Sequence, residues 1–155
     1  MGKRVTWAAA ALVAATALVV SLVTVSVAGP NVVRITVIEH ATTDTVVDLT
    51  ANGDSTGDLL TFHNEVFDAD NEVAIGSSHG DCVRIVVGVS WQCRWTTTLD
   101  EGTLTVEGPF FDEGPSILAI TGGTGDYRAA RGSMRLVALD DLGSEYQFVF
   151  RVFIG

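Results

Sequence analysis

Two polar residues interrupt runs of apolar residues and are the side chains of this sequence best suited to chemistry. Glu39 ends a run in which aliphatic residues occupy every second position, and Asn64 lies between Phe62 and Val66 in a similar run. A carboxylate on an apolar strand face pairs with a cation such as Arg84, has a raised pKa that suits proton transfer, or faces water at a rim. Asn64 can hydrogen-bond a substrate oxygen or satisfy backbone groups at a strand bend. We take Glu39 and Asn64 as the candidate catalytic residues.

Other kinds of catalytic or ligand-binding motif are missing from the sequence. It has no metal-ligand cluster, no nucleophile motif and no paired-carboxylate signature, so we expect neither a metal nor a cofactor. His40, His63 and His79 fall on separate segments beside apolar neighbours, which is typical of surface or interface histidines. The glycine-rich residues 122–125 lack the Lys-Ser/Thr of a phosphate-binding loop, and they predict a tight turn or bulge with positive φ.

The two cysteines, Cys82 and Cys93, have a spacing that suits a β-hairpin. If the turn is centred between Val87 and Gly88, the two cysteines are directly opposed, and opposed Cβ atoms lie near the separation that a disulfide needs. A cross-strand disulfide is one prediction. The other is a pair of free thiols, one or both buried in a pocket.

The elements that must position these residues are β-strands, because apolar residues recur with period two from Val32 onward and no helical stripe is present. The predicted strands span residues 32–41, 45–50, 58–67, 82–87, 91–99, 103–108, 116–121, 133–138 and 145–154. About eight antiparallel strands in so short a chain favour a closed barrel whose interior holds one small ligand. We therefore predict an all-β fold, an eight-stranded antiparallel β-barrel, with a β-sandwich as the competing architecture.

Alternation along each predicted strand assigns an aromatic interior to the barrel. The strand at 82–87 is ambiguous, because Val83, Ile85 and Val87 look more suited to a core than Cys82 and Arg84. The residues that we expect to contact a substrate in the interior are Phe62, Cys82, Arg84, Trp91, Trp95, Phe110 and Phe148.

The composition indicates one exported domain. The 155 residues carry a net charge of −10, which argues against nucleic-acid binding. After Lys3 and Arg4, residues 5–28 are uncharged, as in a signal peptide cut before Gly29 or an uncleaved membrane anchor. We expect this hydrophobic helix at residues 1–28, followed by the barrel domain at 29–155, either secreted or anchored to the outer face of the cytoplasmic membrane.

Several segments carry a family resemblance. Residues 57–67, followed by 80–83, resemble the corresponding run of allene oxide cyclases, and residues 108–111, 118–127 and Gly132 are similar to both allene oxide cyclases and dirigent proteins. The resemblance implies an eight-stranded barrel, often trimeric, that folds a reactive hydrophobic substrate and steers ring closure or coupling without a cofactor. We expect a homodimer or a homotrimer.

The resemblance also assigns residues. The family's pocket asparagine, pocket cysteine and first-strand glutamate correspond to Asn64, Cys82 and Glu39. Ala41 and Phe110 stand where the plant cyclases have an asparagine and a tyrosine, which argues against authentic plant-type allene oxide cyclisation.

The function that we expect is that of a cofactor-independent cyclase or isomerase. It would hold a polyketide, polyene or oxylipin-like chain for stereoselective ring closure in natural-product biosynthesis, by [4+2] cycloaddition or heterocycle formation. Aromatic side chains would shape the cavity, while Glu39, Asn64 and Arg84 would polarise a substrate oxygen. A non-catalytic dirigent-like or ligand-carrying barrel is the alternative. A third possibility is a structural protein whose cavity is filled by its own Trp and Phe side chains.

Overall fold

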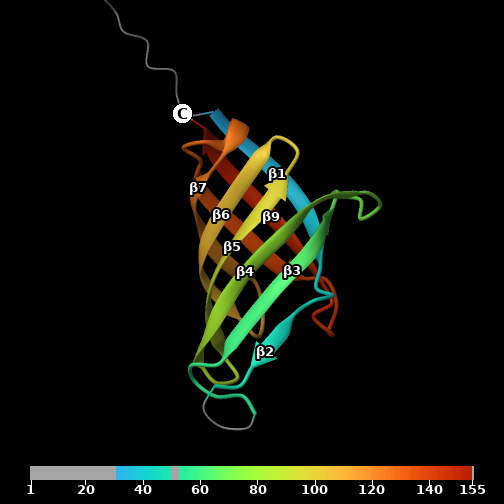
Figure 1. The fold of residues 1–155 in the computed structure, drawn as a ribbon. Helices are drawn as coiled ribbons and strands as arrows, with labels where there is room; N and C mark the ends of the chain where they lie inside the picture. Colours follow the sequence, from blue (N-terminus) through green and yellow to red (C-terminus); the bar gives the residue numbers. More distant parts are fainter. Residues whose placement is uncertain (1–30, 50–52, 155) are drawn as a thin grey trace, which may run out of the picture.

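The computed structural model describes residues 31–49 and 53–154, and they form an all-β barrel with a single 3-10 turn (Figure 1). The predicted N-terminal signal or anchor helix lies outside the described residues. The strands are β1 (Asn31–His40), β2 (Thr45–Val47), β3 (Leu59–Phe67), β4 (Ala74–Val86), β5 (Ser90–Leu99), β6 (Gly102–Phe111), β7 (Ser116–Gly123), β8 (Arg131–Ala138) and β9 (Glu145–Ile154).

The sheet is antiparallel and closes on itself. Its strand order is β1-β9-β8-β7-β6-β5-β4-β3-β2, and an additional pairing of β1 with β3 completes an eight-stranded barrel. The short β2 and β1 pair with the same edge of β3: β2 with residues 59–61 at its start, and β1 with residues 65–67 at its end (Figure 1). This closure confirms the predicted barrel and excludes the β-sandwich.

The interior is built mainly from alternate residues of the eight barrel strands, as the apolar pattern predicts, whereas the residues of β2 are exposed. Phe148 and Phe150 of β9 and Leu104 of β6 are among its largest fully buried side chains. Cys82 and Arg84 also lie on the buried face of β4, whereas Ile85 is half exposed. The alternation of apolar residues within 82–87 therefore indicates the wrong face of β4 as the buried one.

Strand β4 begins at Ala74, eight residues before the predicted start, because its inward positions carry small residues that hide the apolar alternation. Gly80 is the register partner of both Phe62 on β3 and Trp95 on β5. With no side chain at Gly80, the rings of Phe62 and Trp95 meet edge to face, with centroids 6.0 Å apart. A Cβ there would clash with the Trp95 Cβ.

The glycine-rich segment closes one end of the barrel. The β6–β7 ladder shifts register between Thr105 and Val106, opposite the end of β7, and Gly125 has a φ of +59°. These features confirm the predicted bulge and positive-φ turn. Gly125 starts the 3-10 turn η1 (Gly125–Tyr127), whose buried Tyr127 donates a hydrogen bond to Glu101. No helix within the described ranges is long and apolar enough to cross a membrane.

Candidate functional site

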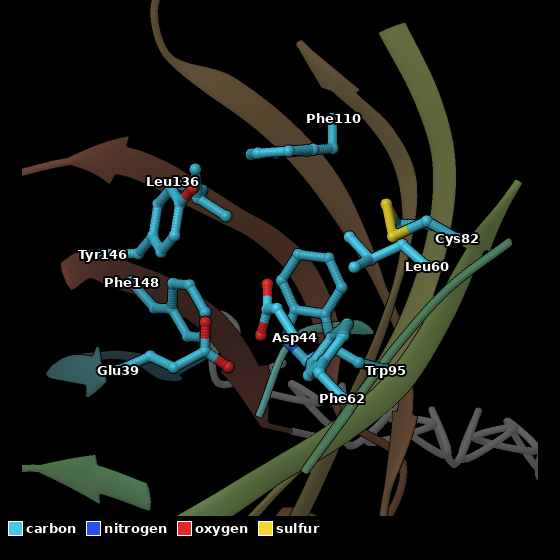
Figure 2. A pocket seen from close by; sticks show the side chains of 11 residues that line it. Glu39, Asp44, Leu60, Phe62, Cys82, Trp95, Phe110, Leu136, Tyr146 and Phe148 are labelled. Carbon is cyan, nitrogen blue, oxygen red and sulfur yellow. A yellow bond between two sulfur atoms is a disulfide. The ribbon is translucent and has the colours of Figure 1, made fainter. Parts of the chain in front are cut away.

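A hollow lies inside the barrel at the end where β1 finishes and β9 begins, away from η1. Its cavity volume is about 30 Å³, and the space free of atoms measures about 340 Å³ when the open mouth is included. A substrate would therefore lie mainly in the open mouth, or side chains would have to move to admit it. Figure 2 shows the lining residues and labels all of them except Cys93. They are Glu39, Asp44, Leu60, Phe62, Cys82, Cys93, Trp95, Phe110, Leu136, Tyr146 and Phe148.

Aromatic rings from four strands form most of the wall. Trp95 lies between Phe62 and Phe148, with ring centroids 6.0 Å and 5.4 Å away. Phe110 of β6 meets Tyr146 of β9 edge to face, with centroids 5.9 Å apart. Of the seven predicted contact residues, the hollow includes Phe62, Cys82, Trp95, Phe110 and Phe148, and leaves out Arg84 and Trp91.

Glu39 is the buried acid of this cavity, with only 5% of its surface exposed. Its register partner on β9 is Tyr146, and its carboxyl accepts a short hydrogen bond from the Ser78 hydroxyl on β4. The pKa of Glu39 is raised to about 7, mainly by burial and also by the Asp44 carboxylate, while hydrogen bonds from Ser78 and Asn64 oppose the rise. A carboxyl with this pKa can both accept and donate a proton near neutral pH.

Asp44 and Tyr146 are site residues that sequence reasoning did not select. Asp44 lies in the loop after β1, where no strand pattern exists to assign it a direction. Tyr146 lies on the predicted apolar face of the last strand, where its hydroxyl was a usable signal. Burial and the nearby Asp44 and Glu39 carboxylates raise the pKa of Tyr146, which keeps its phenol protonated.

Asn64 is buried next to the cavity but its amide is used inside the protein. Its Oδ1 accepts hydrogen bonds from the Thr42 amide (3.1 Å), the Thr43 amide (3.0 Å) and the Thr43 hydroxyl (2.9 Å). Its Nδ2 donates to Asp44 Oδ1 at 2.7 Å. These bonds span the gap in the ladder between β1 and β2, so Asn64 holds the loop that carries Asp44.

The two cysteines form the predicted cross-strand disulfide. Cys82 and Cys93 are register partners on β4 and β5, with Cα atoms 4.0 Å apart, and both line the cavity. The alternative of free thiols is excluded. The pocket cysteine of the family resemblance is therefore an apolar wall element here and carries no thiol.

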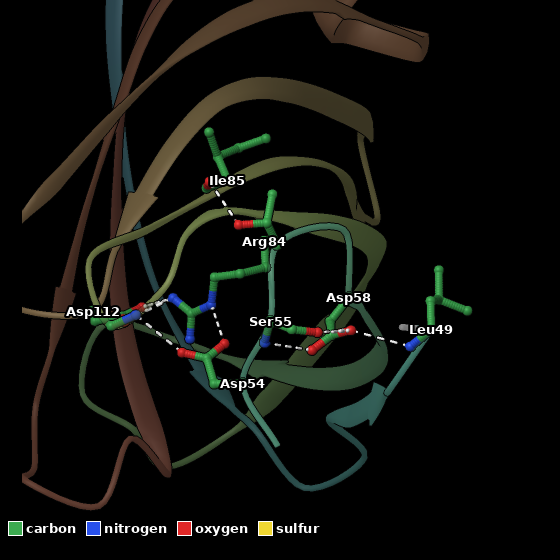
Figure 3. Close-up of polar contacts among 9 residues, drawn as sticks. Leu49, Asp54, Ser55, Asp58, Arg84, Ile85 and Asp112 are labelled. Carbon is green, nitrogen blue, oxygen red and sulfur yellow. Dashed lines mark hydrogen bonds and ion pairs between the residues drawn. The ribbon is translucent and has the colours of Figure 1, made fainter. Parts of the chain in front are cut away.

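Arg84 and Trp91 contact each other and do not line the cavity, and Figure 3 shows Arg84 between Asp54 and Asp112. The Arg84 Nε donates to Asp54 Oδ1 at 2.6 Å, and its Nη1 lies 2.7 Å from Asp112 Oδ1. The guanidinium lies 4.0 Å from the centre of the Trp91 ring. The expected pairing of Arg84 with Glu39 is thus wrong, because two loop carboxylates already neutralise Arg84.

A second buried acid, Asp58, orders the segment before β3 that also carries Asp54. Its carboxylate accepts hydrogen bonds from the Leu49 amide (3.1 Å) and from the amide (2.8 Å) and hydroxyl of Ser55 (Figure 3). These bonds hold the pKa of Asp58 below its usual value. The residues that follow β2 are therefore tied to the mouth by two acids, Asp54 and Asp58.

Two buried polar atoms of β5 have no hydrogen-bond partner among the described residues: the Trp95 indole N–H and the Thr97 hydroxyl. Thr97 is the register partner of Ser78, which is in turn the partner of Asn64. Asn64, Ser78 and Thr97 thus form a polar row across three strands below the aromatic cavity. An unpaired indole N–H in the cavity wall is a donor that a ligand oxygen can satisfy.

No group of three or more His, Cys, Asp or Glu residues suited to a metal occurs in the part of the chain that the structure describes. His63 and His79 are exposed register partners on the outer wall, with ring centroids 6.0 Å apart, as expected for surface histidines. His40 is partly buried and stacks on Phe67. None of the three lines the cavity.

The chain belongs to a known family of barrels. Residues 36–150 match the allene oxide cyclase barrel like domain, which confirms the resemblance read from the sequence. The match spans the cavity-forming strands and covers well over half of the chain.

Solved structures with the same fold carry different activities in their names. A pyocyanin demethylase is 22% identical over 76% of this chain and all of its own, with a TM-score of 0.66. The pterocarpan synthase dirigent protein PsPTS1 is 17% identical over 79% of this chain and 95% of its own, with a TM-score of 0.67. The Diels-Alderase AbmU from Streptomyces koyangensis is 19% identical over 81% of this chain and 70% of its own, with a TM-score of 0.65. At these identities the likeness establishes the fold.

Proposed function

We propose that the protein is a cofactor-independent cyclase or isomerase that closes a ring in a hydrophobic substrate held in the barrel mouth. The observation that carries this proposal is Glu39, a buried carboxyl with a pKa near 7 in an aromatic cavity. Burial of an acid in an apolar site is costly, and perturbed acids of this kind are common at catalytic sites. Barrels of the same fold named as a Diels-Alderase and a dirigent protein support a role in ring closure or coupling.

Glu39 would move one proton during an isomerisation. As carboxylate, it accepts the proton of a substrate hydroxyl while the hydroxyl oxygen bonds to an electron-poor carbon. The electron pair displaced from that carbon collects on a neighbouring substrate atom, to which Glu39 then returns the proton. The product has the mass of the substrate and one additional ring. In a [4+2] closure, protonated Glu39 would instead donate a hydrogen bond to a substrate carbonyl.

The remaining groups position the reaction. The rings of Phe62, Trp95 and Phe148 restrict the substrate to folded conformers, and orientation of this kind supplies several kcal/mol without covalent chemistry. Ser78 orients the Glu39 carboxyl, and Asn64 holds the loop that carries Asp44. Asn64 is therefore proposed as a positioning residue.

The test compares the wild-type chain with Glu39→Gln on linear polyene, polyketide and epoxy-fatty-acid compounds, with chiral chromatography and mass spectrometry of the products. The matched control is Glu65→Gln, which alters an exposed glutamate on the outer face of β3. We expect a single enantiomer of unchanged mass from wild type and Glu65→Gln, and at least about a hundredfold lower rate from Glu39→Gln. Equal rates in all three proteins would remove Glu39 from the mechanism.

A dirigent-like carrier is the second candidate, favoured by the likeness to a dirigent protein and by a cavity whose lining has no Ser, Thr, Lys or free Cys. It predicts that ligands bind and are recovered unchanged, or couple selectively only when an external oxidant generates the reactive species. Recovery of every compound intact from the panel, with measurable binding, would establish this role.

We also propose that the barrel works outside the cytoplasm. The uncharged residues 5–28 after Lys3 and Arg4 have the composition of an export signal or membrane anchor. The Cys82–Cys93 disulfide suits an oxidising compartment. Fractionation of cells that express the tagged chain tests this, because a cytosolic, reduced protein would contradict it.

A further inference from the structure

The cavity has the charge of a site for cations. Its lining includes two carboxyl groups, Glu39 and Asp44, and no Lys, Arg or His among the described residues. Arg84, the buried cation of this end of the barrel, is neutralised by Asp54 and Asp112. Asp44, together with Glu39 above its pKa of about 7, therefore makes the potential inside the cavity negative.

The negative charge continues outward from the cavity. Phe110, Leu136 and Tyr146 line both the cavity and an outer hollow of about 420 Å³, so the two spaces adjoin. This volume is in the range of small-molecule sites, roughly 300–1,000 Å³. The acids that line the outer hollow are Asp112, Glu113, Asp140 and Asp141.

The aromatic wall adds a second attraction for a cation. The faces of aromatic rings carry partial negative charge, and rings that surround a space recognise organic cations. Trp95 contacts both Phe62 and Phe148 in the wall. Phe110 and Tyr146 contact each other and line both the cavity and the outer hollow. Carboxylates beside such rings favour an organic cation over a hydrated metal ion, which aromatic carbon cannot ligate.

The unpaired Trp95 indole N–H supplies an independent sign of a ligand. Trp95 is 4% exposed, lines the cavity and has no partner for this donor among the described residues. A buried donor without an acceptor is costly, and a ligand oxygen would remove that cost. The cavity wall therefore contains one buried donor that still lacks an acceptor.

We propose that the substrate or cargo of this barrel is a flat hydrophobic molecule that bears a positive charge, and that the cavity rejects hydrophobic carboxylates. The inference deepens the proposed function, since the same cavity would bind this molecule. It narrows the substrate class away from fatty-acid-derived carboxylates, which would face Asp44 and the acids of the outer hollow.

The test uses three bicyclic probes of similar shape and different charge: 1-methylquinolinium, neutral 1-methyl-2-quinolone and anionic 1-naphthoate. Isothermal titration calorimetry at pH 8 measures their affinities for the full chain. We expect 1-methylquinolinium to bind at least about tenfold more tightly than 1-naphthoate, with the quinolone between them. Equal or tighter binding of 1-naphthoate, or no binding of the cation at millimolar concentration, would overturn the inference.

Two variants test whether the cation binds in the cavity. Asp44→Asn keeps an oxygen that can accept from Asn64 Nδ2 and removes one charge, so we expect it to weaken 1-methylquinolinium severalfold and to leave the quinolone unchanged. Glu65→Gln removes an exposed charge from the outer wall and should alter neither affinity. An identical loss of cation binding in both variants would show that the net charge of the protein sets the affinity. That result would contradict a cation site in the cavity.

These outcomes are independent of catalysis, because binding is measured without turnover. Cation selectivity without conversion of any compound would leave this inference standing and remove the cyclase proposal. Conversion of a carboxylate substrate, with loss of rate in Glu39→Gln, would support the cyclase proposal and contradict the cation inference.

Discussion

The guanidinium of Arg84 lies 4.0 Å from the centre of the Trp91 ring, and the two residues are register partners on β4 and β5. Arg84 is only 7% exposed, yet it is bonded to acids from two different loops, Asp54 and Asp112. The stacked pair therefore joins the loop before β3 to the loop after β6. Removal of its charge would leave both acids unpaired at the barrel mouth.

We predict that Arg84→Met destabilises the protein by roughly 2 kcal/mol, because it removes a buried guanidinium that bonds two exposed carboxylates and stacks on Trp91. Arg94→Met is the matched control. It removes an exposed arginine paired with Asp81 on the outer wall, and we expect a loss below about 1 kcal/mol. Chemical denaturation followed by circular dichroism measures both. Similar losses in the two variants would show that burial of the Arg84 network adds nothing.

The disulfide in the cavity wall is expected to stabilise the barrel by roughly 3 kcal/mol, since it closes a loop with a sequence separation of 11 residues. The double variant Cys82→Ala, Cys93→Ala should lose that free energy of unfolding. Wild type should lose a similar amount when a reductant is added. The reductant should have no effect on the double variant, and a shift there would mean that the reductant acts elsewhere.

Much of this barrel follows from local pattern. The alternation of Phe62 with its neighbours on β3, and of Phe148 on β9, correctly predicts which side chains face inward, because strand geometry fixes the side of each residue. The Cys82–Cys93 pair follows from hairpin spacing alone. Glu39 is found by the same rule, as a charged residue on a buried face.

The remaining features depend on contacts that no local pattern encodes. The start of β4 is hidden because Gly76, Ser78 and Gly80 fill inward positions between large neighbours. The partners of Arg84 lie 30 and 28 residues away on loops, so its role at the mouth has no local signal. Asp44 enters the site only because Asn64, 20 residues later, fixes its loop.

That loop gives a third prediction. Asn64→Ala removes the acceptor of three hydrogen bonds from Thr42 and Thr43 and should cost roughly 2–3 kcal/mol. Amide hydrogen exchange at Thr42 and Thr43 should become faster. Asn71→Gly removes exposed hydrogen bonds to His40 and Glu145 without straining the positive φ of 61° at this position, and should cost below about 1 kcal/mol. Unchanged exchange at Thr42 and Thr43 in Asn64→Ala would contradict the positioning role.

The last prediction concerns the effect of Glu39 on stability as pH changes. The carboxyl has a pKa of about 7 in the folded protein against an ordinary value of 4.5, so its burial favours the protonated form. Below pH 4.5 both the folded and the unfolded chain hold this proton, and burial brings no ionisation penalty. Between pH 4.5 and 7 the unfolded chain releases the proton and the folded chain keeps it. The free energy of unfolding therefore falls by about 1.4 kcal/mol for each pH unit in this window, or roughly 3 kcal/mol in all.

Glu39→Gln lacks this titration, so the stability of wild type relative to Glu39→Gln should fall by that amount between pH 4 and pH 8. Urea denaturation of both proteins at pH 4, 6 and 8 measures the difference, which cancels the titration of groups common to both. Glu65→Gln, altered on the outer face of β3, should parallel wild type. Parallel curves for wild type and Glu39→Gln would mean that Glu39 ionises as freely as a surface glutamate, and the proton-transfer role would lose its physical basis.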